Sequence, residues 1–128
     1  MCARRRGRLE RVERQQLLFC IRLPFVADPS NSRIQVFDPG GKFITKWTDV
    51  GQPWGLAYYG KENCLYMRDG KNDRVVKLNL DGQVSGVLGS CGKTPGRFDF
   101  AHNMAVDSTG AIYVAEIKNW RVQKFAPR

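Results

Sequence analysis

Residues 67–78, MRDGKNDRVVKL, decide the fold. The same order of residue types occurs in residues 26–37 and 114–125: an acid, an asparagine three positions later, an arginine five later, a β-branched residue six later and Phe or Leu nine later. The three acids lie 41 and 47 residues apart. A period of this length predicts a repeat protein in which each period forms one supersecondary unit.

The sequence around these turns predicts four short strands in each repeat. In the last repeat, residues 104–106, 112–115 and 121–125 alternate in the manner of strands, and Asn119 between them tolerates a positive φ. In the middle repeat, Asp81-Gly82 separates two apolar runs, which indicates a hairpin to an outer strand at 84–88. Four-stranded antiparallel units at this spacing are typical of β-propeller blades.

The repeated acid and arginine are expected to pair across each turn, and the repeated asparagine belongs to the same turn. We interpret these residues as structural, because a catalytic pair need not recur in every blade. We expect Phe37, Leu78 and Phe125 to lie in the core between blades. The nine structural residues are Asp28, Asn31, Arg33, Asp69, Asn72, Arg74, Glu116, Asn119 and Arg121.

The pattern resembles the NHL-repeat β-propeller family. The resemblance is carried by the Ala-Val-Asp and Tyr-Val-Ala segments between Ala105 and Ala115 and by the three Asn-x-Arg-[Ile/Val] turns. It implies an all-β fold, a partial propeller of about two and a half to three four-stranded antiparallel blades. The blades are expected at about residues 25–50, 51–89 and 97–126 of a propeller region at 25–128, after a basic N-terminal arm.

The number of blades bears on the partners of the chain. The first repeat has strands two to four, with residues 16–22 as a candidate first strand, and the third ends before a fourth strand. Closed propellers have at least four blades. The chain is therefore expected to be a fragment, an open arc, or half of a homo-oligomer that closes a six-bladed ring.

The arm at residues 1–24 has seven arginines against two acids, a net charge of +5 out of +9 for the chain. We expect it to be disordered or a short helix. Arg22 ends its apolar stretch after five residues, so it has no export signal and a cytoplasmic location is the default. No membrane partner is expected, and the four cysteines are expected to be reduced thiols.

Ligand contacts are expected mainly from the loops before the inner strands, the usual site in this family. The resemblance extends to NHL-type lyases that act on peptidyl-hydroxyglycine, in which histidines from such loops bind a channel metal and Tyr and Arg lie nearby. Only His102 is a candidate metal ligand here, and one histidine does not make a zinc site. Zinc or calcium would require a ring completed by another chain or by missing blades. The candidate binding residues are Trp54, Tyr58, Arg68, Arg97, Phe98, His102 and Asn103.

Three functions remain open. The first is a module that binds a protein, peptide or small ligand. The second is a fragment or half-ring of a metal-dependent lyase, although no catalytic residue is assigned and activity of this chain alone is not expected. The third is binding of single-stranded RNA by a basic loop face with stacking aromatic residues, which would lose affinity with salt. That face would use Lys61, Arg68, Lys71, Lys93 and Arg97 with Trp54 and Phe98.

Overall fold

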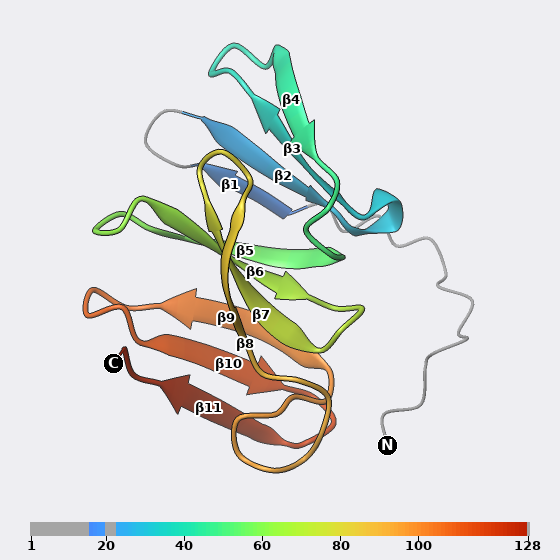
Figure 1. Ribbon diagram of the computed structural model, residues 1–128, viewed down its shortest axis with the longest axis vertical. Helices are drawn as coiled ribbons and strands as arrows, with labels where there is room; N and C mark the ends of the chain where they lie inside the picture. Colours follow the sequence, from blue (N-terminus) through green and yellow to red (C-terminus); the bar gives the residue numbers. More distant parts are fainter. Residues whose placement is uncertain (1–15, 20–22, 128) are drawn as a thin grey trace.

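The computed structural model describes residues 16–19 and 23–127, which form three antiparallel sheets (Figure 1). The first sheet contains β1 (Gln16–Phe19), β2 (Pro24–Asp28), β3 (Arg33–Phe37) and β4 (Phe43–Trp47), with the short 3₁₀ turn η1 (Pro29–Asn31) after β2. The second contains β5 (Pro53–Tyr59), β6 (Cys64–Asp69), β7 (Arg74–Asn79) and β8 (Val84–Leu88). The third contains β9 (Ala101–Val106), β10 (Ile112–Glu116) and β11 (Arg121–Phe125).

Each sheet is a meander in which every strand pairs with the next one along the chain. The first strands β1, β5 and β9 contact one another from sheet to sheet, so they form the inner edge of the assembly. The last strands β4 and β8 are mostly exposed and form the outer edge. This is the architecture of propeller blades, and it confirms the all-β fold of two and a half to three blades.

Two hydrophobic cores join the three blades. One lies between the first and second blades and includes Phe25, Ile34, Met67 and Leu78. The other lies between the second and third blades and includes Tyr66, Val75, Phe98, Ile112 and Val114. The strand β6 is buried along its whole length because its two faces line different cores.

Of the three residues expected in the core between blades, Leu78 and Phe125 lie there and Phe37 does not. Leu78 is fully buried in the first core, and Phe125 packs on the second. Phe37 is half-buried and contacts Phe43 edge-on, with ring centroids 5.9 Å apart. It lies on the side of the first blade that faces away from the second.

The expectation of disorder or a short helix in the arm is wrong for Gln16–Phe19, which pairs with β2 as the first strand of its blade. The sequence also offered residues 16–22 as a candidate first strand of this blade, and the structure has a strand at four of these residues. The rest of residues 1–22 lies outside the described part of the chain. In the structure the first blade comprises residues 16–19 and 24–47, the second comprises 53–88 and the third comprises 101–125.

Two further expectations are corrected. The positive φ in each turn falls on the residue after the asparagine, namely Ser32, Asp73 and Trp120, and not on Asn119. The expectation that the cysteines are reduced thiols is wrong for Cys91, which is disulfide-bonded. Cys64 is a free and buried thiol. In the described residues, no helix has both the length and the apolar character needed to cross a bilayer.

Candidate functional site

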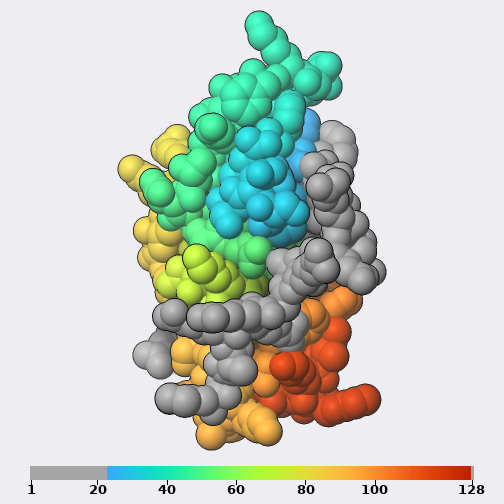
Figure 2. Space-filling model, turned by 90° about the vertical axis from the view of Figure 1, so that its right-hand side faces the viewer, coloured from blue at the N-terminus to red at the C-terminus, as the bar shows by residue number. Residues whose placement is uncertain are grey.

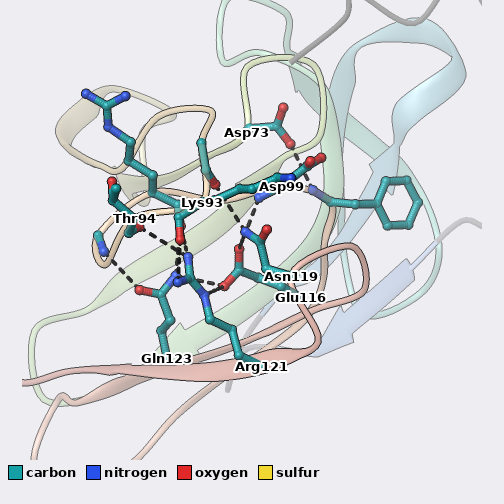
Figure 3. Close-up of polar contacts among 12 residues, drawn as sticks. Asp73, Lys93, Thr94, Asp99, Glu116, Asn119, Arg121 and Gln123 are labelled. Carbon is teal, nitrogen blue, oxygen red and sulfur yellow. Dashed lines mark hydrogen bonds and ion pairs between the residues drawn. The ribbon is translucent and has the colours of Figure 1, made fainter. Parts of the chain in front are cut away.

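The repeated acid of each blade is held by the asparagine and the arginine of its own turn, a set that we call the clamp. Asp28 accepts hydrogen bonds of 2.9 Å from both Asn31 Nδ2 and Arg33 Nε. Asp69 accepts from Asn72 Nδ2 at 2.8 Å and Arg74 Nε at 2.9 Å. Glu116 accepts from Asn119 Nδ2 at 2.7 Å and Arg121 Nε at 2.6 Å (Figure 3).

The clamps also position the loops that lead into the inner strands. Asp69 Oδ1 accepts a hydrogen bond of 3.1 Å from the backbone N–H of Gln52, just before β5. Glu116 Oε1 accepts one of 3.0 Å from the N–H of Asp99, just before β9. Figure 3 shows Arg121 and Gln123 reaching the same loop, where they donate to the carbonyl oxygen of Arg97 at 2.9 and 2.8 Å. The repeated turn thus fixes the backbone from which loop side chains project.

Burial and hydrogen bonding have opposite effects on the clamp acids. Burial alone would raise the pKa of Asp69, but hydrogen bonds from Asn72, Gln52 and Arg74 outweigh it and hold the pKa below the ordinary value. The pKa of Asp28 and the pKa of Glu116 are lowered by the same balance. All three acids are therefore anionic at neutral pH and keep their arginine partners.

Arg68 is the most unusual residue of the second blade. It occupies the position that Ala27 and Ala115 take in the other blades, and it is only 4% exposed. Its guanidinium donates to the carbonyl oxygen of Trp54 at 2.8 Å and to that of Ala101 in the third blade. No carboxylate of the described residues forms an ion pair with it, and its Nε has no partner there. Burial lowers the pKa of Arg68 to about 10, so the buried group remains charged at neutral pH.

Three rings form a row that starts beside Arg68 and that we call the rim: Trp54, Phe100 and His102. Trp54 contacts Phe100 edge-on with ring centroids 5.7 Å apart, and Phe100 stacks on His102 at 6.5 Å. Arg68 lies 5.5 Å from the centroid of the Trp54 ring, within the range of a cation–π contact. His102 is exposed, whereas Trp54 and Phe100 are half-buried.

Gly70 makes room for the rim. A Cβ atom at this position would lie 2.5 Å from the Trp54 ring, closer than van der Waals contact allows. The equivalent residues of the other blades are Pro29 and Ile117, so glycine occurs only where a tryptophan lies over the turn. The second blade therefore differs from the other two at the two positions that flank Asp69, Arg68 and Gly70, and both contact Trp54.

The rim and the clamps are carried by repeats that occur in known proteins. No protein-family model matches the chain. Over 115 aligned residues the chain is 35% identical to NHL repeat-containing protein 3 of Homo sapiens. The alignment covers 80% of this chain and 32% of that protein. The chain belongs to the NHL-repeat β-propellers. The Mus musculus protein of the same name is 34% identical with the same coverage, so this NHL chain spans about a third of the length of these relatives.

Solved structures show the same arrangement of blades. A structural genomics protein of unknown function from Bacteroides thetaiotaomicron superposes with a TM-score of 0.69, at 18% identity, over 88% of this chain and 34% of that one. Virginiamycin B lyase from Staphylococcus aureus gives a TM-score of 0.65, at 12% identity, over 92% and 43%. Identities this low show a shared fold and nothing of its chemistry.

The NHL blades bring only some of the candidate binding residues together. Trp54, Arg68 and His102 meet at the rim, and the exposed Asn103 follows His102 on β9. Tyr58 lies near the other end of β5, where its hydroxyl donates to Asn63 at 2.6 Å. Arg97 is exposed and lies in the loop that Arg121 and Gln123 hold.

The expectation that Phe98 contacts a ligand does not fit its burial. Its ring is fully buried in the second core, edge-on to Phe125 at 5.6 Å, so no base or peptide reaches it. Lys61 also lies apart from the rim, because it is in the turn between β5 and β6 at the opposite end of the blade from Lys71. The basic loop face expected for RNA is therefore smaller than the sequence indicates.

The side chains near His102 do not fit a zinc site. A catalytic zinc needs about three protein ligands, and the described residues contain no group of three His, Cys, Asp or Glu side chains that could hold a metal ion. The His102 ring stacks on the aromatic ring of Phe100. No metal-dependent step is derived for this chain.

Sequence reasoning missed two aromatic residues. Phe100 joins Trp54 to His102 and has a φ of 56°, a strained value that no sequence pattern signalled. Trp120 is 92% exposed with a φ of 51° at the tip of the third clamp. The repeat alignment held a signal for Trp120, because the small or polar residues Ser32 and Asp73 occupy its place in the other blades.

Proposed function

We propose that the chain is a binding module of an NHL propeller, and that its rim receives an acidic peptide segment of a partner protein. The observation that carries the proposal is the row of rings Trp54, Phe100 and His102, in which the Trp54 ring contacts the buried Arg68. An aromatic row gives a peptide a large contact area at a small cost in side-chain entropy. It is typical of surfaces that bind other proteins.

The charge around the rim supports an acidic ligand. Arg68 carries a positive charge without an ion-pair partner among the described residues, and the turn that follows its strand carries the exposed Lys71. The same turn also carries one acid, Asp73, which accepts a hydrogen bond from the backbone N–H of Phe100. A group buried away from water interacts with an approaching anion more strongly than a surface lysine does. The peptide is expected to lie along the exposed edge of His102, with its acidic side chains toward these cations.

Two peptides of equal length test the proposal, one with glutamates and aromatic residues and the other with the glutamates replaced by glutamine. Fluorescence anisotropy should show binding of the glutamate peptide alone, and His102→Ala should weaken it at least several-fold. Lys46→Ala, an exposed change on the outer strand β4, serves as the control and should have no effect. Equal affinity for both peptides, or equal loss in both variants, would contradict the proposal. A single-stranded RNA that binds where neither peptide does would assign the rim to nucleic acid instead.

A further inference from the structure

Two buried nitrogen donors beside the rim have no acceptor among the described residues, Arg68 Nε and Trp54 Nε1. They belong to side chains in contact, since the guanidinium carbon of Arg68 lies 5.5 Å from the centre of the Trp54 ring. A buried donor that loses water without gaining an acceptor destabilises the fold, so proteins keep few of them. Two such donors in one contact indicate an acceptor that comes from outside the chain.

The same contact holds a positive charge that its partners do not neutralise. Arg68 is 4% exposed, and its other two nitrogens donate to the uncharged carbonyl oxygens of Trp54 and Ala101. The ion pairs among the described residues all involve other cations. A buried charge without a counter-ion is costly. An uncharged acceptor would satisfy the two donors and leave that charge in place, so the acceptor is expected to be an anion.

Gly70 keeps the donor edge of Trp54 clear of side-chain atoms. A Cβ atom at Gly70 would lie 2.6 Å from Trp54 Nε1, so any other residue here would crowd that nitrogen. In Figure 2 the turn after β6, coloured yellow-green, lies between the first blade, in blue to cyan, and the third, in orange to red. The cluster thus belongs to the junction between the second and third blades, and both blades contribute to it.

We propose that Arg68 and Trp54 bind one carboxylate group, which accepts from Arg68 Nε and Trp54 Nε1 and neutralises the guanidinium. A carboxylate has two acceptor oxygens, so it can accept from two donors at once, and it matches the planar guanidinium. Because both nitrogens are buried in the free chain, the half-buried Trp54 side chain has to shift as the group enters. The inference rests on the proposed function for the source of the carboxylate, an acidic side chain of the peptide.

Sodium formate is the probe of this site, and the indole N–H signals of the three tryptophans report on it by NMR. With sodium chloride holding the ionic strength constant, formate should shift the Trp54 signal downfield to saturation, because charge-assisted hydrogen bonds are short and strong. The signal of Trp120, which is 92% exposed, should not move. Trp54→Phe assigns the signal by removing it. A Trp54 signal that formate leaves unmoved would overturn the proposal.

Two variants with the same loss of charge separate this site from general attraction of anions. Arg68→Met should abolish the formate shift. Lys61→Met is the matched control and should keep it, because Lys61 is exposed at the opposite end of the same blade. A shift that persists in Arg68→Met, or that disappears equally in both variants, would contradict the proposal.

Thermal unfolding gives a second readout that does not depend on the Arg68 variant. Formate should raise the Tm of the wild type more than the same concentration of chloride does, since a ligand of the folded state stabilises it. Trp54→Phe keeps an aromatic ring and the Arg68 charge but lacks one donor, so it should reduce this rise. A rise of equal size in Trp54→Phe would overturn the proposal.

The formate and peptide experiments fail separately. Formate binding at Trp54 without binding of either peptide would keep the carboxylate site and overturn the peptide function. A glutamate peptide that binds without moving the Trp54 signal would overturn the carboxylate site alone.

Discussion

Arg68 of the second blade donates a hydrogen bond to the carbonyl oxygen of Ala101, the first residue of the inner strand of the third blade. The same guanidinium donates to Trp54 in its own blade. One side chain therefore fixes the spacing between the two loops that carry the rim. In the other blades alanine at this position leaves no such bridge, which makes the junction between the second and third blades distinct.

Replacement of Arg68 separates its volume from its charge. Arg68→Ala should lower the free energy of unfolding by about 3 kcal/mol, because it leaves a cavity and removes both bridging hydrogen bonds. Arg68→Met fills the space and relieves the buried charge, so it should cost only about 1 kcal/mol. Urea denaturation measures both values. A methionine variant less stable than the alanine variant would contradict a structural role based mainly on packing.

The second clamp should contribute more to stability than a surface ion pair of the same blade. Arg74→Met leaves the fully buried Asp69 without its cation and should cost about 3 kcal/mol. Glu62→Gln removes the exposed pair with Lys77 and should cost at most about 0.5 kcal/mol. Thermal unfolding of the two variants under one buffer condition measures the difference. Equal losses would show that the clamp is dispensable.

Acid should unfold the protein through the clamp acids. Their pKa values in the fold lie below the ordinary 3.8 of Asp and 4.5 of Glu, so the unfolded chain takes up protons first as the pH falls. The stability they contribute is complete above those ordinary values and is lost as the pH drops through the lower values of the fold. Denaturant midpoints measured on both sides of pH 4 should show this loss. A midpoint that stays constant through that range would contradict the clamp geometry.

The turn of the third blade offers a stabilising substitution. Trp120 is almost fully exposed and has a φ of 51°, a left-handed conformation that asparagine tolerates better than tryptophan. Trp120→Asn should therefore raise the free energy of unfolding by about 0.5 to 1 kcal/mol. Trp120→Ala removes the ring but keeps the strain and should gain less. A loss of stability in the asparagine variant would mean that the Trp120 ring has a contact of its own.

The blades were predictable from sequence because their determinants are local and repeated. The acid, asparagine and arginine of each clamp lie within six consecutive residues, so their spacing alone indicates the turn. The strands at 84–88 and 121–125 have the predicted bounds, since a Gly-containing hairpin and a clamp mark their starts. The strand β9 begins three residues earlier than predicted, because it pairs through a bulge next to Glu116 that the sequence does not mark.

The rim was less predictable because it joins residues of two strands and a loop from two blades. Trp54, Arg68 and His102 were candidates from the sequence, but nothing there showed that Phe100 connects the first to the last. Phe98 lies only two residues from Phe100 and points instead into the core between blades. Phe100 also has a left-handed backbone, with a φ of 56°. Neither the composition nor the repeat pattern marks this conformation.

The face-to-face packing of the blades is the central claim, and methyl NMR tests it most directly. Val75 on β7 and Ile112 on β10 are far apart in sequence and share the core between the second and third blades. Nuclear Overhauser cross-peaks between their methyl groups should appear in the folded protein and vanish in denaturant. Strand-like chemical shifts for both residues without any such cross-peak would show that the sheets form but do not stack as blades.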